Sequence, residues 1–189
     1  MNKLHRVRHC LGCFMLAFSV LACAAGDDTG FHIVRAELPV RQGQHQLDVD
    51  IDYGFSNAVI DALDHGVPLT LVIKLDIVRE SAWPWDAYVL QERKNFEIRF
   101  YSLTKNYQLT LLDTGEKRSF VSLNSLVRKM GKLSIVLDKG SRLIHGARYQ
   151  ARVAVTLDIE ALPLPLRPIA YFSPDWYLSS PWYTWTFEG

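Results

Sequence analysis

Strict alternation of apolar and polar side chains is the feature that most constrains how this chain can fold. Apolar residues occupy nearly every second position in four stretches of the sequence: 47–53, 69–77, 96–100 and 149–159. Successive side chains of a strand point to opposite faces, so this period of two predicts half-buried antiparallel strands. Weaker versions of the pattern predict further strands at 31–38, 107–112, 133–137 and 183–187.

Two short helices are expected between these strands. Ser56 is a suitable N-cap for a helix over residues 57–64. Ser122 or Asn124 would start a second helix, which runs to residue 130 and ends at a glycine. Both helices are short, so packing must hold them in place.

Together these elements predict an all-β fold: a mostly antiparallel β-sandwich, immunoglobulin-like in architecture, with two short helices. Three prolines within residues 163–168 exclude a central strand there and indicate a crossover connection. We expect a single β-sandwich domain over residues 24–189, which is long enough to bury a substantial core. The three cysteines lie at positions 10, 13 and 23, all before this domain, so the domain itself is expected to contain no disulfide.

Residues 1–23 have the pattern of an export signal. A basic head with Lys3, Arg6 and Arg8 precedes an apolar run at 10–22 and a group of small residues at 22–26. A helix over the apolar run would reach about 20 Å, whereas a hydrocarbon core is about 30 Å thick. Cleavage is therefore favoured over a retained membrane anchor, and we expect a periplasmic protein.

Two modes of cleavage fit the end of this signal. Ala22-Cys23-Ala24 matches an A-x-A site, which would release a soluble protein. Val20-Leu21-Ala22-Cys23 is similar to a bacterial lipobox, after which Cys23 would be acylated. Cys23 is therefore a lipidation candidate, and we expect membrane contact only through such a lipid anchor.

Charge and motifs argue against several classes of function. Removing the three basic residues of the signal from 21 leaves 18 basic against 20 acidic residues, so no nucleic-acid partner is expected. The histidines lack metal-ligand spacing, and there is no G-x-S-x-G motif. Asp48, Asp50 and Asp52 alternate with apolar residues, which predicts a solvated strand face. We expect no catalytic residues, no metal and no cofactor.

The five tryptophans form two clusters, at 83–85 and 176–185. One interpretation is an exposed aromatic platform, whose interaction candidates are Trp83, Trp85, Trp176 and Trp182. The other places the rings in the core, with Trp182 reaching across the sandwich, because each aromatic side chain buries about 150–250 Å². We favour the core for the clusters as a whole. Trp83 and Trp85 flank a proline, so they are expected to be the more exposed pair.

A series of motifs also occurs in order from about residue 31 to the end of the chain. It comprises Ala62-Leu63-x-x-Gly66-Val67-Pro68-Leu69, Ile77-Val78-Arg79, Tyr101-x-Leu103-Thr104-x-x-Tyr107, Phe120-x-x-Leu123, Tyr149-x-Ala151-Arg152, Leu157-Asp158, Leu162-Pro163 and Asp175-Trp176-x-Leu178-Ser179-Ser180-x-Trp182. In the order of these motifs, the chain resembles an exported proteobacterial protein family, the domain of unknown function 4390 (DUF4390). The resemblance implies an envelope protein whose gene often neighbours that of a membrane sensor kinase. It implies no catalytic residues.

Three functional hypotheses fit this sequence. The first is a non-enzymatic periplasmic binding or interaction module, linked to envelope sensing by a membrane kinase. Its contacts to a protein partner would come from the Trp83–Trp85 loop or from an open sheet edge. The second is a hydrolase with a pocket that holds two close carboxylates of perturbed pKa. The third is a structural lipoprotein anchored through Cys23.

Overall fold

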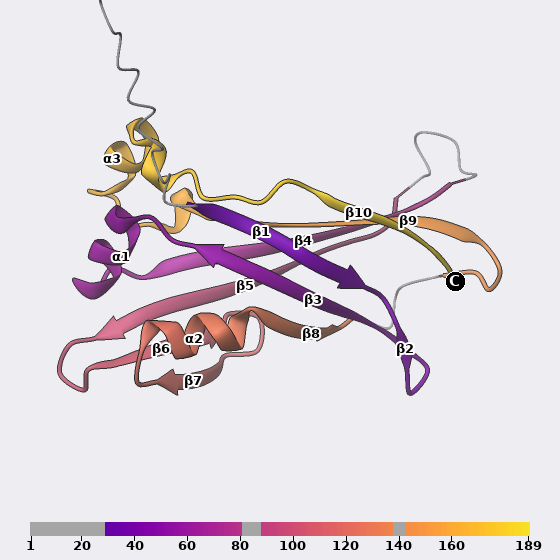
Figure 1. The fold of residues 1–189 in the computed structure, drawn as a ribbon, viewed down its shortest axis with the longest axis horizontal. Helices are drawn as coiled ribbons and strands as arrows, with labels where there is room; N and C mark the ends of the chain where they lie inside the picture. Colours follow the sequence, from indigo (N-terminus) through magenta and orange to yellow (C-terminus); the bar gives the residue numbers. More distant parts are fainter. Residues whose placement is uncertain (1–28, 81–87, 138–142) are drawn as a thin grey trace, which may run out of the picture.

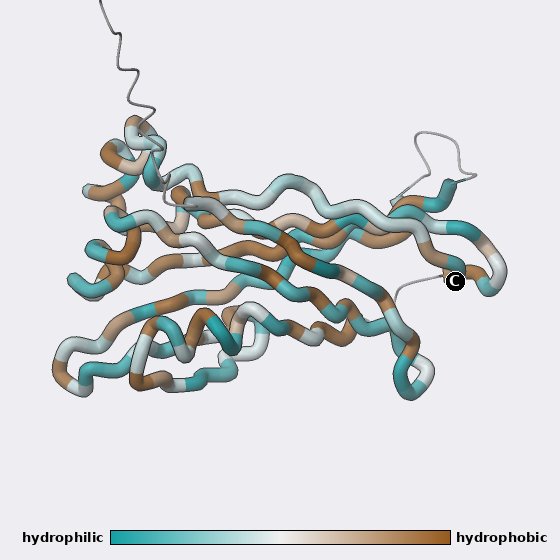
Figure 2. Tube along the Cα trace, in the orientation of Figure 1, coloured by the Kyte–Doolittle hydropathy of each residue, from teal (hydrophilic) through white to brown (hydrophobic). Residues whose placement is uncertain are grey.

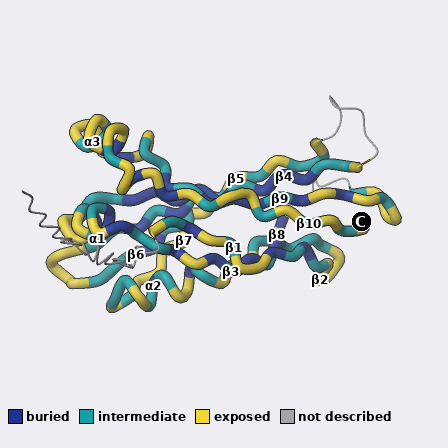
Figure 3. The backbone as a smooth tube through the Cα atoms, turned by 45° about the horizontal axis from the view of Figure 1, so that its top comes forward, coloured by how far each residue is buried: buried dark blue, intermediate teal, exposed yellow. Residues whose placement is uncertain are grey.

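The computed structural model describes residues 29–80, 88–137 and 143–189. They form two antiparallel sheets, which lie as separate layers along the molecule (Figures 1 and 3). The smaller sheet contains β1 (Gly30–Glu37), β2 (Val40–Arg41), β3 (Gln44–Gly54) and β8 (Lys132–Val136). The larger sheet contains β4 (Leu69–Arg79), β5 (Tyr88–Tyr101), β6 (Asn106–Leu111), β7 (Glu116–Phe120), β9 (Arg148–Leu157) and β10 (Tyr183–Glu188).

The two sheets differ in width. In the smaller sheet β3 is central: it pairs with β1 and β2 along one side and with β8 along the other. The larger sheet has the order β10-β9-β4-β5-β6-β7. The chain moves between the sheets from β3 to β4, from β7 to β8 and from β8 to β9. The smaller sheet is therefore too narrow to cover the whole inner face of the larger one.

One hydrophobic core joins the sheets. It includes Leu47, Val49 and Ile51 from β3, and Leu71 and Ile73 from β4, each of which is buried. These are the apolar positions that the alternation predicted, and Figure 2 shows apolar and polar residues interleaved along the strands. The prediction of a mostly β fold is confirmed as two antiparallel sheets, whereas the immunoglobulin-like architecture stays a prediction.

Both predicted helices are present and connect the sheets. They are α1 (Asn57–Asp64), between β3 and β4, and α2 (Leu123–Met130), between β7 and β8. Ser56 and Ser122 are their N-caps, and each side chain accepts a hydrogen bond from the backbone N–H three residues later, at 3.3 and 3.2 Å. A local signal in the sequence was enough to predict these elements, because capping depends on neighbouring residues only.

The expectation of only two helices is wrong. A third helix, α3 (Arg167–Phe172), lies in the segment expected to be a crossover, between the 3₁₀ turns η1 (Ile159–Ala161) and η2 (Pro174–Trp176). Pro168 is in its first turn, where a missing N–H removes no helical hydrogen bond. The prolines exclude a central strand, as expected, but they do not exclude a helix that has one of them in its first turn.

Two features of the larger sheet were not predicted. Four of the five residues of β7 are exposed, so this strand has no apolar face that a pattern could show. β5 begins at Tyr88, well before the predicted start at residue 96. Glu92 and Lys94 occupy inner-face positions of β5, which breaks the apolar alternation there.

The α1 cap also makes a tertiary contact. The Ser56 hydroxyl donates to the backbone carbonyl of Asp175 in η2, at 2.7 Å, and Ser56 is buried. We expect Ser56→Ala to lower the free energy of unfolding by about 1–3 kcal/mol, because the cap and the tertiary hydrogen bond are both lost. Ser122→Ala, which removes a cap alone, is expected to lower it by about 1 kcal/mol. Urea denaturation of both variants measures the difference; equal losses would contradict a stabilising role for the contact to Asp175.

Candidate functional site

The open edge of β8 is the main candidate for a binding site. Among the described residues β8 pairs only with β3. Hydrogen bonds to β3 flank the strand at Gly131 and at Leu137. Because hydrogen-bonding directions alternate along an antiparallel strand, Lys132, Ser134 and Val136 direct their backbone N–H and C=O groups to the open edge. These groups are available to another strand.

A groove of about 400 Å³ runs beside this edge. Its apolar lining consists of Phe96, Leu109 and Leu111 from β5 and β6, and of Leu133, Ile135 and Val136 from β8. Phe96 and Leu109 are buried members of the core, so the groove opens directly above it. It lies where the smaller sheet ends and the inner face of the larger sheet continues.

Charged side chains surround the groove. They come from β5, from the β6–β7 hairpin, from α2 and from β8: Lys94, Asp113, Glu116, Arg118, Lys129 and Lys132. Arg118 forms an ion pair with Glu116 at 2.7 Å. Within the described parts of the chain, Lys129 and Lys132 form no ion pair with an acidic side chain. These two ammonium groups give one end of the groove a positive charge.

An ion pair occupies the inner face of β5 beside the groove. Glu92 and Lys94 have the same alternation as Phe96, so they point between the sheets. Lys94 Nζ lies 2.9 Å from Glu92 Oε1 and 3.7 Å from Asp113 Oδ2. Both Glu92 oxygens are buried, and neither accepts a well-oriented hydrogen bond from the described residues. Apolar residues of similar size are often at least as stable as such a pair, so core packing does not explain it.

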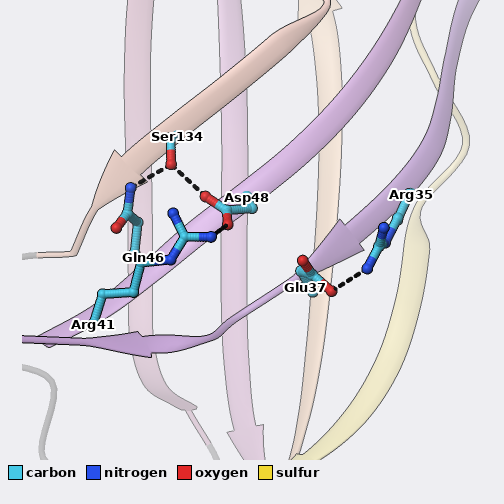
Figure 4. Close-up of polar contacts among 6 residues, drawn as sticks. All are labelled: Arg35, Glu37, Arg41, Gln46, Asp48 and Ser134. Atoms are coloured by element: carbon cyan, nitrogen blue, oxygen red, sulfur yellow. Dashed lines mark hydrogen bonds and ion pairs between the residues drawn. The ribbon is translucent and has the colours of Figure 1, made fainter.

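The opposite face of the smaller sheet carries a polar network (Figure 4). The Gln46 amide donates to the Ser134 hydroxyl, which donates to Asp48, and Arg41 donates to Asp48 at 2.6 Å. These contacts join Ser134 of β8 to Gln46 and Asp48 of β3, and they join Asp48 in turn to Arg41 of β2. They add side-chain links to the backbone pairing of β8 with β3.

The tryptophan candidates lie in different settings. Trp176, in η2, is only 5 % exposed and packs in the core. Trp182 is 43 % exposed. Trp83 and Trp85 lie outside the described residues, as does the lipidation candidate Cys23. The structure therefore does not bring the four tryptophans together into one described platform.

Trp182 lies on the outer face of the larger sheet, so the interpretation that placed its ring across the inside is wrong. The guanidinium carbon of Arg152 is 4.5 Å from the centre of its ring, which is a cation–π distance. Arg152 also donates two hydrogen bonds to Asp76, at 2.8 and 2.9 Å, and one to Tyr88. The hydrogen bond to Asp76 is the main reason that the pKa of Arg152 is raised. The cluster holds three adjacent strands together on that face.

The other raised pKa values described next belong to residues that do not line the groove. Burial raises the pKa of Tyr53, whose side chain is in the core. Desolvation and a hydrogen bond to Asp64, at 2.7 Å, raise the pKa of Tyr107 to about 12. In the described residues, no three His, Cys, Asp or Glu side chains lie close enough to hold a metal ion. No described helix is long and apolar enough to span a bilayer.

The sequence did not point to the groove residues individually. Lys129 and Lys132 belong to an ordinary charged stretch, and only the pairing of β8 with β3 places them beside Phe96 and Leu109. Glu92 and Lys94 are the residues near the groove that the sequence could have singled out. Both fall at positions that continue the apolar face of β5 backwards from Phe96, so a longer strand would have placed them inside.

The fold and the groove define a class of protein: a mostly β domain of two sheets, with an open strand edge above an apolar groove that has a charged rim. The family model described as a domain of unknown function, DUF4390, matches residues 28–186. The chain therefore belongs to this family, and the resemblance of the motifs is confirmed. Comparison with curated proteins and with solved structures finds no match in either.

The ion pair on the inner face of β5 can be tested by substitution. We expect Lys94→Met to lower the free energy of unfolding by about 2 kcal/mol, because Glu92 and Asp113 then lack their cation while partly shielded from water. The double variant Glu92→Leu/Lys94→Met is expected to be at least as stable as the original protein. Urea denaturation measures both. A double variant that is as unstable as the single one would mean that the charges serve folding.

An exposed ion pair supplies the control for this measurement. Arg35 and Glu37 are 2.6 Å apart, but their side chains are 66 % and 45 % exposed. Arg35→Met is expected to change stability by less than about 1 kcal/mol.

Proposed function

We propose that this protein is a non-enzymatic binding module of the bacterial envelope, which takes up an extended segment of a protein partner as an added strand on β8. The observation that carries this proposal is the open edge of β8 beside an apolar groove. Strand addition draws affinity from backbone hydrogen bonds and specificity from pockets for alternate side chains. Both elements are present at one place.

The geometry of the edge supports a short, extended ligand. β8 is five residues long, and three of its residues direct backbone groups outward. Every second side chain of an added strand would point into the groove, where Leu111 and Ile135 are partly exposed. The matching ligand therefore has apolar side chains at alternate positions.

The charge of the rim supports a further property of the ligand. Lys129 and Lys132 stand at the end of the groove nearest to α2. An acidic side chain at the corresponding end of the bound segment would pair with them. Such pairs at a rim set orientation and partner choice more than they add affinity.

The place of this module in the cell is part of the proposal. The signal pattern of residues 1–23 supports a periplasmic location, with Cys23 as an alternative lipid anchor. The family resemblance supports a protein partner that takes part in envelope sensing, such as a membrane kinase. An extended periplasmic segment of that partner would be the ligand of the groove.

Peptide selection tests the proposal. A display library of random peptides is selected on the full chain, and the affinity of the selected peptides is then measured by fluorescence anisotropy. We expect alternating apolar residues in the selected sequences. We expect Ser134→Pro to lower their affinity at least about tenfold, because proline removes the central N–H of the open edge.

Ser134→Ala is the matched control. It loses the same side-chain hydrogen bonds to Gln46 and Asp48 but keeps the backbone N–H. Its affinity is expected to stay within about twofold of the original protein. Circular dichroism checks that both variants fold. Equal affinities for the proline and alanine variants, or a selection that yields no peptide, would count against strand addition at β8.

A further inference from the structure

Exposed apolar side chains gather around α3. Five large ones fall within residues 164–177, and together they are called the α3 patch: Leu164, Ile169, Tyr171, Phe172 and Tyr177. Phe172 is 90 % exposed and Leu164 is 73 % exposed. Single exposed apolar residues are common on proteins, but a group gathered on and around one helix indicates a contact surface.

Contacts with neighbouring residues of the domain hold the α3 patch in place. A helix of six residues has little stability of its own. Here Ala170 is fully buried, the Arg167 Nε donates to the carbonyl of Leu162 at 2.8 Å, and the Tyr177 hydroxyl donates to the carbonyl of Tyr171 at 2.6 Å. These contacts orient α3 so that Ile169 and Phe172, three residues apart, share its outer side. Exposure of these side chains is thus built into the fold.

The patch lies at the end of the molecule where the described chain begins. Phe31, at the start of β1, packs on Phe55 with ring centres 5.4 Å apart. The next residue, Ser56, donates to Asp175 of η2, and η2 contacts α3. Figure 1 likewise places α3 and the start of β1 at the same end, while β2 lies at the opposite end.

The sequence before this point contains the apolar run at 10–22. Only residues 23–28 separate that run from the first described residue, Thr29. Six residues span at most about 20 Å when fully extended. A chain attached to a membrane through this run, or through an acylated Cys23, would therefore have its α3 end close to the bilayer.

We propose that the α3 patch rests on the lipid bilayer and orients the domain with its α3 end toward the membrane. This inference rests on the envelope location in the proposed function and on attachment to the membrane through Cys23 or the apolar run, but not on the groove. Leu164, Ile169 and Phe172 would enter the boundary between headgroups and acyl chains, and Tyr171 and Tyr177 suit the headgroup level. The exposed Glu160 and Asp175 lie close by in sequence, so the contact is apolar rather than an attraction to anionic lipid.

Quenching by brominated lipid tests this orientation. The full chain is reconstituted in vesicles of brominated phosphatidylethanolamine with a minor share of phosphatidylglycerol, with tryptophan introduced by Phe172→Trp or, in a second variant, by Val40→Trp. Val40, in β2, is 60 % exposed and lies at the opposite end of the molecule. We expect the quenching added by the reporter at 172 to exceed that at 40 at least about twofold, since interfacial side chains reach about 5–10 Å into the bilayer. The difference should persist at high salt.

Two further results decide the matter. Ile169→Ser, added to the reporter at 172, is expected to reduce its quenching, whereas Ser134→Pro should leave it unchanged. Failure of the groove is therefore distinguishable from failure of the patch. Equal quenching at 172 and 40 would overturn the proposal. So would a reporter at 172 that stays unquenched in lipid and shifts its emission only when envelope proteins are added, because the occupant would then be a protein.

Discussion

Hydrophobic contact between two sheets of unequal width is the constraint on which the rest of this structure depends. β3, β4 and β9 together supply nearly half of the buried apolar residues of the core, and each lies in the interior of its sheet. The larger sheet extends through β5 and β6 past the place where β8 ends the smaller one. Its apolar inner face therefore continues into the groove. The candidate site is thus a consequence of how the core is covered, rather than a separate addition to the fold.

The sequence predicted those parts of the fold whose signals are local. Alternation located β3, β4 and β9, and the serine caps located α1 and α2, since a strand face or a cap depends on residues close in the chain. The exposed strand β7 has no apolar face, and α3 has in its first turn a proline that also fits a crossover. The groove could not be predicted because the residues that line it come from separate segments of the chain, β5, β6 and β8, which only the fold brings to the same place. The position of Trp182 could not be predicted either, because its ring packs on Arg152 of β9, a residue 30 positions earlier in the chain.

Folding alone does not explain the polar residues Glu92 and Lys94 on the inner face of β5. Folding alone would favour apolar side chains at the positions of Glu92 and Lys94, because their neighbours on the inner face are apolar. Asp76 and Arg152 differ in this respect. They form two hydrogen bonds on the outer face, where Tyr88 and Trp182 also contact the guanidinium group. A complete set of partners gives that cluster a structural explanation, whereas the buried oxygens of Glu92 remain without hydrogen bonds among the described residues.

The two surfaces proposed here are compatible because they lie apart. α3 stands at one end of the molecule (Figure 1), whereas the groove is lined by residues of β5, β6, the β6–β7 hairpin, α2 and β8. In a domain that rests on a bilayer through α3, the edge of β8 would take no part in the lipid contact, because none of its residues belongs to the α3 patch. An extended segment of a membrane protein could then reach the groove from the periplasmic side while both proteins stay at the membrane. Confinement of this kind raises the effective concentration of the partner, so a short added strand of modest intrinsic affinity would suffice.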